Sequence, residues 1–332
     1  MKNIAILSTI NARLKPLLVI MFSIGMVWPT LSEAQVPARF YWKTLSGANA
    51  MPLIYESVSG NTNPFDSPHT VTPGADFDAT LTLAGYAHTF SLFDRAAMAA
   101  VIVPMGRISG DVTVAGKTAN QSTSGFGDPM LEFDLNIIGP PAQKNIPDMI
   151  RYEPGFSLDV LADLALPIGD YDDSQPLNLG QNRWYGRIGA PIIAQIGPWI
   201  PGQRTTLELL PSVWFFGNND DYVGQTLETD PMFQLDAHLT RDLTEHFWGS
   251  LDAAWMNGGE ATIDGVEGEP LNNIGVGFTF GYGINDNLNL TVGYKSTIND
   301  SAPDDLRMDM FMVSLVYGWH PLLEGARRLK EG

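Results

Sequence analysis

The 332-residue chain contains no cysteine, which excludes disulfide bonds, thiol catalysis and thiolate metal sites. It is also poor in basic residues, with 19 Lys and Arg against 37 Asp and Glu and a net charge of −18. Three of those basic residues and one acidic residue lie in Met1–Ala34, so the rest of the chain carries 16 against 36, a net charge of −20. Nucleic acid and anionic lipid surfaces are poor partners for such a protein.

Long apolar runs are missing as well. The run Leu17–Trp28 has twelve residues, fewer than the roughly 20 that a membrane helix needs. It follows three basic residues and precedes Ser32-Glu33-Ala34, which is the order of a secretory signal. We therefore expect residues 1–34 to be a signal peptide, and any membrane insertion of the remaining chain to require a β-barrel.

Alternation of apolar with small or polar residues is the dominant pattern in what remains. In Asn272–Ser296 it runs through two arms joined by Asn285-Asp286-Asn287. A period of two indicates β-strands, and Asn and Asp favour the tight turn between them. Soluble sandwiches and membrane barrels share this alternation, so the hairpin alone does not separate them.

The same pattern predicts twelve strands in all. They are Ala38–Leu45, Asp76–Leu92, Ala96–Met105, Phe126–Ile138, Phe156–Leu166, Trp184–Ile196, Thr205–Phe216, Met232–Arg241, Phe247–Met256, the two hairpin arms and Met308–Trp319. Long connections, such as Ser46–Ala75 and Gly106–Gly125, alternate with short ones, except at Gly139–Pro154. An even strand number with long loops at one end is typical of outer-membrane barrels.

We therefore predict an all-β fold, a transmembrane antiparallel up-and-down β-barrel of about twelve strands in the bacterial outer membrane. The barrel would span residues 35–319, and a C-terminal tail would follow at 320–332. Aromatic residues near strand ends, Trp199 and Trp248 among them, are expected in the girdles at the lipid–water interfaces.

If the apolar face of each strand meets lipid, the other face lines the lumen. The lumen candidates are Asp78, Glu132, Asp134, Asp159, Asp163, Arg187, Glu208, Asp236, His238, Asp252, Lys295 and Asp309. Nine acids against two fixed cations favour cations or neutral polar solutes over anions. The alternative is that these groups form a hydrogen-bonded plug, since twelve strands lie between the filled eight-stranded and the water-filled sixteen-stranded barrels.

Four segments resemble an outer-membrane family labelled "MetA-pathway of phenol degradation". The matching residues are Gly127, Asp128, Pro129, Pro167, Gly169, Tyr171, Asn178, Gly180, Asn182, Arg183, Trp184, Asn219, Tyr222, Asp230 and Pro231. The resemblance implies a transporter-like outer-membrane β-barrel and, more loosely, passage of small organic molecules. Arg183 is either a latch onto luminal carboxylates or part of a simple turn.

No catalytic motif stands out. His238, Ser250 and Asp252 offer a base, a nucleophile and an acid on neighbouring strands, but any acidic lumen with one histidine does so, and we expect no enzyme. The acidic loop clusters at 170–173, 218–221 and 304–305 lack the spacing of a calcium loop, so we expect neither a metal nor a cofactor.

Strand number, the acidic lumen and the resemblance together predict a channel or transporter with an acid-lined lumen that favours neutral or cationic solutes. That these solutes are small organic molecules, aromatic compounds among them, is what the resemblance implies. The alternative is a plugged structural or surface-recognition barrel without transport. The expected partners are outer-membrane lipid, a small organic solute and the barrel assembly machinery, and no nucleic acid.

Overall fold

The computed structural model describes residues 36–114, 117–302 and 305–325. The chain divides into the units Met1–Thr30 and Leu31–Gly332, and the description concerns the second. The expected signal peptide and residues 326–332 of the expected tail lie outside the described residues.

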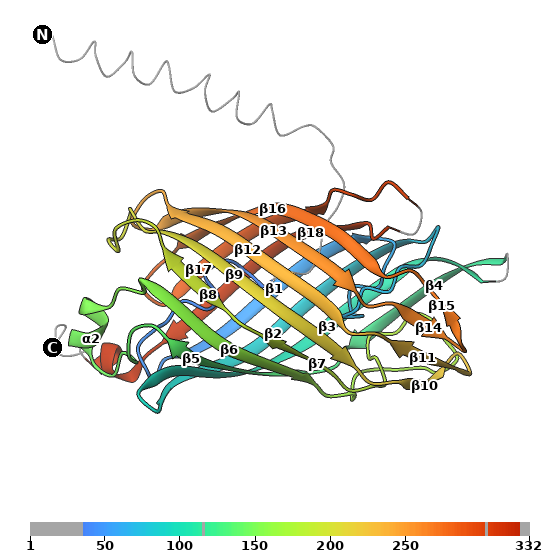
Figure 1. Cartoon of the computed structure of the whole chain (residues 1–332), viewed down its shortest axis with the longest axis horizontal. Helices are drawn as coiled ribbons and strands as arrows, with labels where there is room; N and C mark the ends of the chain where they lie inside the picture. Colours follow the sequence, from blue (N-terminus) through green and yellow to red (C-terminus); the bar gives the residue numbers. More distant parts are fainter. Residues whose placement is uncertain (1–35, 115–116, 303–304, 326–332) are drawn as a thin grey trace, which may run out of the picture. The chain divides into compact units, whose positions relative to one another are not determined.

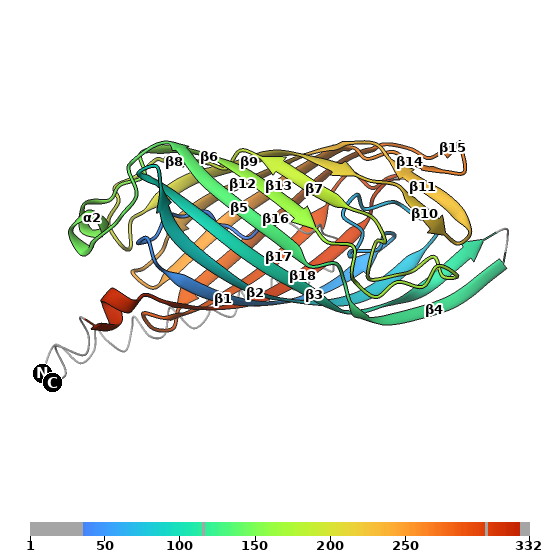
Figure 2. The ribbon, with the colours of Figure 1, turned by 90° about the horizontal axis from the view of Figure 1, so that it is seen from below.

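Leu31–Gly332 folds into a closed antiparallel barrel (Figures 1 and 2). The wall is formed by β1 (Asn49–Gly60), β2 (Asp76–Leu92), β3 (Arg95–Val114), β5 (Met130–Ile138), β6 (Phe156–Ala165), β7 (Tyr185–Gly189), β8 (Ile192–Gln195), β9 (Thr205–Phe216), β12 (Met232–Asp242), β13 (Phe247–Gly258), β16 (Leu271–Gly283), β17 (Leu288–Thr297) and β18 (Met308–Trp319). Apart from β7 and β8, which each pair with β6 and β9, every strand pairs with the next along the chain, and β18 pairs with β1 to close the ring. Because β7 and β8 both lie between β6 and β9, they share one position, and the wall has twelve.

The remaining elements lie at the two ends of the barrel. β4 (Lys117–Phe126) pairs only with the second half of β3, and β10 (Asn219–Tyr222), β11 (Gln225–Thr229), β14 (Ala261–Ile263) and β15 (Val266–Glu267) form a separate four-stranded sheet. The helix α2 (Ile146–Arg151), capped by the side chain of Asn145, lies at the opposite end (Figure 1).

Short turns gather at the end where α2 lies. The β2–β3 turn consists of Phe93 and Asp94, both with positive φ (51° and 66°), as the type I′ turn of a two-residue hairpin requires. The β5–β6 connection, residues 139–155, is the long exception at this end because it contains α2. The other long connections and the four-stranded sheet lie at the opposite end. In outer-membrane barrels the short turns are periplasmic and the long loops extracellular, and the two ends are named accordingly below.

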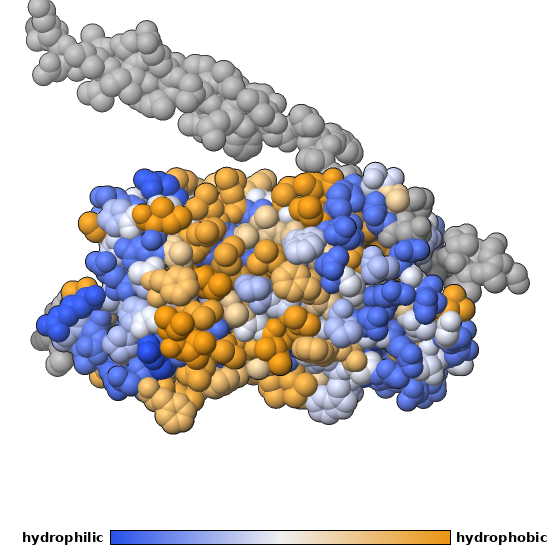
Figure 3. Space-filling model, viewed as in Figure 1, coloured by the Kyte–Doolittle hydropathy of each residue, from blue (hydrophilic) through white to orange (hydrophobic). Residues whose placement is uncertain are grey.

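The outward face of the wall is apolar. Leu251, Phe278 and Phe311 are 68%, 43% and 46% exposed, and in Figure 3 hydrophobic residues form a band across the middle of the barrel between hydrophilic ends. A closed sheet with such a band satisfies its backbone hydrogen bonds internally and meets hydrocarbon outside. The chain is thus a bacterial outer-membrane β-barrel.

Among the described residues, none of the helices is long and apolar enough to cross a membrane.

The prediction at the N-terminal end of the barrel was wrong. The first strand is β1, not Ala38–Leu45, and it lies inside the expected loop Ser46–Ala75. Residues 36–48 instead form turns whose side chains bond to the inner wall. The alternation in β1 was missed because Ile54 and Val58 give its buried face the same apolar character as Leu53 on its exposed face.

The expected loop Gly106–Gly125 was also wrong, because β3 and β4 continue through it as a long hairpin. Its glycines mark close packing. At Gly106 an added Cβ would collide with the Thr80 carbonyl oxygen, and at Gly110 with that of Asp76. Glycine in a strand commonly allows another backbone to approach this closely.

Candidate functional site

Ten of the twelve lumen candidates are buried side chains of the wall. They are Glu132, Asp134, Asp159, Asp163, Arg187, Glu208, Asp236, His238, Asp252 and Lys295, with exposures between 0% and 7%. Eight of them alternate along their strands with an exposed apolar neighbour, as Asp252 does with Leu251. The neighbours of Asp236 and Lys295 are half-buried. Since the outer neighbours meet lipid, the buried parity faces the lumen.

Asp78 and Asp309 lie on the opposite face, contrary to the prediction. Asp78 is exposed, and the buried residues of its strand are Phe77, Ala79 and Leu81. Asp309 accepts hydrogen bonds from Ser59 Oγ at 3.2 Å and Tyr294 Oη at 3.0 Å. The parity is reversed here because the extracellular half of the lumen is filled by an apolar core, so the apolar residues of β2 and β18 point inward.

Acidic and basic side chains meet on the inner faces of β5, β6 and β7. Glu132 lies opposite Asp163, and Asp163 lies opposite Arg187 in the strand register. The Arg187 Nε donates to Asp163 Oδ2 at 2.7 Å, and its guanidinium lies 4.9 Å from the ring centroid of Trp214. Asp134 follows Glu132 on the same face, two residues on.

A second polar cluster surrounds Asp252. Its Oδ1 contacts His238 Nδ1 at 2.7 Å and accepts from Ser250 Oγ at 2.5 Å, and its Oδ2 accepts from Thr279 Oγ1 at 2.5 Å. The serine therefore donates to the carboxylate. A nucleophile would instead need to donate to the histidine, so this arrangement differs from a catalytic triad.

Residues 36–48 lie inside the periplasmic end of the barrel (Figure 2). Lys43 Nζ donates to Asp134 Oδ2 at 2.9 Å and also to Asp159 Oδ2. Arg39 Nη1 donates to Asp242 Oδ1 at 2.7 Å, and Trp42 Nε1 donates to Glu208 Oε1 at 2.7 Å. We call residues 36–48 the plug segment. Burial lowers the pKa of Lys43, and the neighbouring Asp134 opposes that shift.

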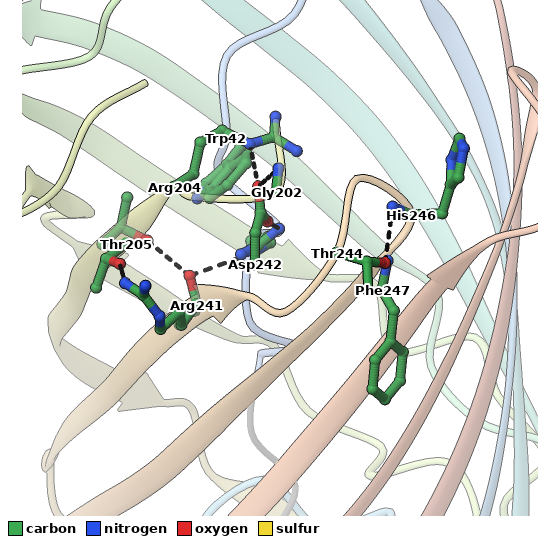
Figure 4. Close-up of polar contacts among 12 residues, drawn as sticks. Trp42, Gly202, Arg204, Thr205, Arg241, Asp242, Thr244, His246 and Phe247 are labelled. Atoms are coloured by element: carbon green, nitrogen blue, oxygen red, sulfur yellow. Dashed lines mark hydrogen bonds and ion pairs between the residues drawn. The ribbon is translucent and has the colours of Figure 1, made fainter. Parts of the chain in front are cut away.

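Aromatic rings also contact the plug segment at its binding site on the inner wall. The Arg39 guanidinium lies 4.2 Å from the Trp42 ring centroid and 4.4 Å from that of Trp248, and Trp42 packs against Trp199 with centroids 4.8 Å apart. Trp199 and Trp248 thus contact the plug segment and not the interfacial girdle for which they were predicted. In Figure 4, Asp242 lies beside Trp42, and it also accepts from Arg204 Nε at 2.7 Å.

The extracellular half of the lumen is closed by an apolar core. Phe65 from the β1–β2 connection and Leu177 and Leu179 from the β6–β7 connection are buried among inward residues of the wall, such as Ile108 and Met308. These two connections therefore lie within the barrel mouth.

The family-motif residues build this closure. Asp128 accepts from the Gly169 N–H at 2.9 Å and from the Gln181 N–H at 2.8 Å. Burial raises the pKa of Asp128, and those two N–H groups oppose the shift. An added Cβ at Gly169 would lie 2.6 Å from the Gly127 carbonyl carbon, and one at Gly180 would lie 2.7 Å from that of Gly169. The glycines thus let three backbone segments stack.

Arg183 joins the two connections as a buried latch. Its side chain is 0% exposed, and its Nη2 pairs with Asp66 at 3.2 Å while its Nη1 donates to Thr229 Oγ1 at 2.7 Å. The partner is thus a loop carboxylate, whereas the sequence suggested wall carboxylates. Asp66 escaped prediction because nothing in the loop sequence marks it as inward.

The other motif residues mostly stabilise loops. Asn178 Nδ2 donates to the Gln175 carbonyl at 2.8 Å, and Asn219 Nδ2 donates to Tyr171 Oη at 2.8 Å. Asn182 Nδ2 donates to Asn219 Oδ1 at 3.0 Å. Four motif residues are on the rim or only partly buried, namely Trp184, Tyr222, Asp230 and Pro231, and Pro129 and Pro167 flank the β5 and β6 ends.

Sequence reasoning missed several buried charges of the lumen. Glu56 on β1 is 4% exposed, and Arg39, Lys43 and Asp242 form the ion pairs described above. Arg39 and Lys43 were assigned to a wall strand, which hid their role. Within the described residues, no group of three or more His, Asp or Glu side chains is placed to hold a metal ion.

Two pockets flank the plug segment. One, of about 30 Å³, is lined by Tyr41, Lys43 and Asp134 among others, and the other, of about 20 Å³, by Tyr41, Glu208 and His238 among others. Spaces of this size admit water-sized ligands, and an aromatic solute needs far more room.

Comparison with known proteins finds solved structures that are similar to this chain. The COG4313 outer membrane channel from Pseudomonas putida F1 superposes with a TM-score of 0.69 at 18% identity, over 86% of this chain and 100% of that chain. The transport unit of the autotransporter AIDA-I from Escherichia coli gives a TM-score of 0.48 at 10% identity, over 85% and 93%. No curated protein matches the sequence. The family model described as "Putative MetA-pathway of phenol degradation" matches residues 60–315, and the chain belongs to that family.

Proposed function

We propose that this protein is an outer-membrane channel that passes small organic solutes, neutral or cationic and aromatic compounds among them, along an acid-lined lumen. The observation that carries the proposal is the charge of the inner wall. Seven of the predicted acids are buried residues of the wall, and Arg187 and Lys295 are the buried cations among the predicted wall residues. Further positive charge comes from Arg39 and Lys43 of the plug segment.

An acid-lined wall selects by sign, because rings of charge at close quarters attract cations and repel anions. The description of the similar Pseudomonas protein as an outer membrane channel supports transport. The family description refers to phenol degradation, and a neutral phenol meets no repulsion from carboxylates. Insertion through the barrel assembly machinery and contact with outer-membrane lipid belong to the same proposal.

Conduction requires the plug segment and the extracellular core to move, because together they fill both halves of the lumen. The same contacts favour a second candidate function, a barrel that stays plugged and serves in structure or surface recognition. The two candidate functions differ in whether solute passes through the lumen and so crosses the membrane.

Solute flux into proteoliposomes separates them. We expect the refolded protein to admit a small organic cation faster than an anion of the same size, and the double variant Asp236→Asn, Asp252→Asn to reduce that ratio. Asp309→Asn, on the outward face, is the matched control and should leave the ratio unchanged. Equal flux of cation and anion would contradict the acid-lined channel, and no flux at all would favour the plugged barrel.

A further inference from the structure

Three carboxylates form one patch on the inner wall. Glu132 on β5 lies opposite Asp163 on β6, and Asp134 lies two residues further on the same face of β5. Residues opposite each other in an antiparallel pair have Cβ atoms roughly 5 Å apart. The three side chains are 6%, 5% and 2% exposed, so water screens them little.

The fixed charge around this patch does not balance. Lys43 pairs with Asp134 and with Asp159, and Arg187 pairs with Asp163. Four carboxylates thus share two cations. Removing charges from water is costly unless they are paired. A further positive charge at the patch would therefore be stabilised by the carboxylates.

Unpartnered acceptor atoms mark where that charge would sit. Within the part of the chain that the structure describes, Glu132 Oε1, Asp134 Oδ1 and Asp163 Oδ1 are buried and have no hydrogen-bond partner. The hydroxyl of the buried Tyr41 is likewise unpartnered, and this residue interacts electrostatically with all three acids. Buried polar atoms normally have partners, so these four oxygens are available to a hydrogen-bonding ligand.

The space beside the patch limits the size of the ligand. A pocket of about 30 Å³ borders the patch at Tyr41 and Asp134 and is also lined by Lys43 and Met98, whereas Glu132 and Asp163 do not line it. A cavity needs roughly 10–15 Å³ of such space to hold one water, so this pocket admits a group of about the size of ammonium.

We propose that the patch formed by Glu132, Asp134, Asp163 and Tyr41 binds an ammonium group, either the ammonium ion or the head group of a primary amine. An –NH₃⁺ group has three donors and no acceptor, which matches the three unpartnered carboxylate oxygens. The Lys43 side chain shows the same chemistry within the chain, because its ammonium already lies between Asp134 and Asp159. The proposal deepens the proposed function by naming a head group for its cationic solutes.

Stability against heat tests binding without any transport. The fraction of the detergent-refolded protein that loses its compact gel mobility is measured against temperature in ammonium, methylammonium, potassium and tetramethylammonium chloride at one ionic strength. A ligand that binds only the folded state raises the midpoint in a saturable way. We expect ammonium and methylammonium to do so. Potassium matches ammonium in charge and size but donates no hydrogen bond, and tetramethylammonium has no N–H, so both should have little effect.

Glu132→Gln should weaken the apparent ammonium affinity at least tenfold, and Glu153→Gln, the same change at an exposed residue, should leave it unchanged. If Glu132→Gln does not refold, Tyr41→Phe provides the same test, with a loss of at least threefold expected. Equal effects of all four salts, or an unchanged affinity in both site variants, would overturn the proposal. Because no flux is measured, the channel function stands or falls separately.

Discussion

Lys43 anchors the plug segment to the wall, and replacing this residue should increase the undocked fraction of the segment more than replacing any other anchor. Its side chain is 9% exposed, and Asp134 and Asp159 are 3% and 1% exposed. Replacing it in the variant Lys43→Met keeps an unbranched stem and removes the charge, leaving two buried carboxylates without their counter-ion. Breaking a buried pair in this way costs about 3–5 kcal/mol. At about 1.4 kcal/mol per tenfold change, the undocked fraction should rise by roughly a hundredfold or more.

The absence of natural cysteine allows a direct assay. Leu45 in the plug segment is 3% exposed, so a thiol introduced as Leu45→Cys reacts with a maleimide only when the segment leaves its seat. When docking is fast relative to the reaction, the labelling rate is proportional to the undocked fraction. Lys43→Met in this background should label roughly a hundred times faster.

Lys144→Met is the matched control, because it removes a lysine paired with Asp94 at the surface, with side chains 51% and 67% exposed. Exposed pairs contribute little, so its labelling rate should stay close to that of the parent. Equal rates in the Lys43 and Lys144 variants would refute the role of Lys43 as the anchor.

Two further predictions concern the extracellular closure. Burial lowers the pKa of His69 to about 4 from 6.5. The open loop therefore binds the proton below pH 6.5, and the closed loop binds it only near pH 4. As the pH falls through this window, the free energy that favours the closed loop should decrease by up to about 3 kcal/mol. Hydrogen exchange of residues 61–75 should therefore accelerate over that range. The variant His69→Asn should abolish this pH dependence, and asparagine tolerates the positive φ of 51° at this position. The same pH dependence in the variant would contradict the role of His69. The variant Arg183→Met leaves Asp66 buried and unpaired, so hydrogen exchange in residues 61–75 and 166–184 should speed up by roughly a hundredfold. The control Arg241→Met, at an exposed arginine, should have no such effect. Equal protection in the two variants would show that Arg183 does not hold the two connections together.

The sequence predicted the wall well because lipid and lumen impose opposite demands on alternate residues. β9 and β18 have the predicted bounds. In β9 the outward Leu207 stands out against its polar neighbours Thr206 and Glu208. The alternation fails where the lumen is apolar. Asp78 and Asp309 were misplaced because the core around Phe65 makes the inner face of their strands as apolar as a lipid face.

The plug segment could not be derived from the same rules. A short alternating run such as Ala38–Leu45 has the pattern of a wall strand, and only the tertiary structure shows that Arg39 and Lys43 meet the carboxylates of Asp242 and Asp134. The motif glycines were visible in the sequence. The reason that glycine is needed at these positions is the close backbone stacking of Gly127, Gly169 and Gly180. That stacking brings together segments that are separated in the sequence, so the sequence alone does not show it.

The measurement that tests the account most directly is the reversal potential of the refolded barrel in a planar bilayer under a KCl gradient, for the wild type and for Lys43→Met. An acid-lined lumen closed by the plug segment predicts small or infrequent cation-selective currents from the wild type and larger ones, of the same selectivity, from the variant. Anion-selective current, or silence from both proteins when each shows the heat-dependent gel shift of a folded barrel, would contradict it.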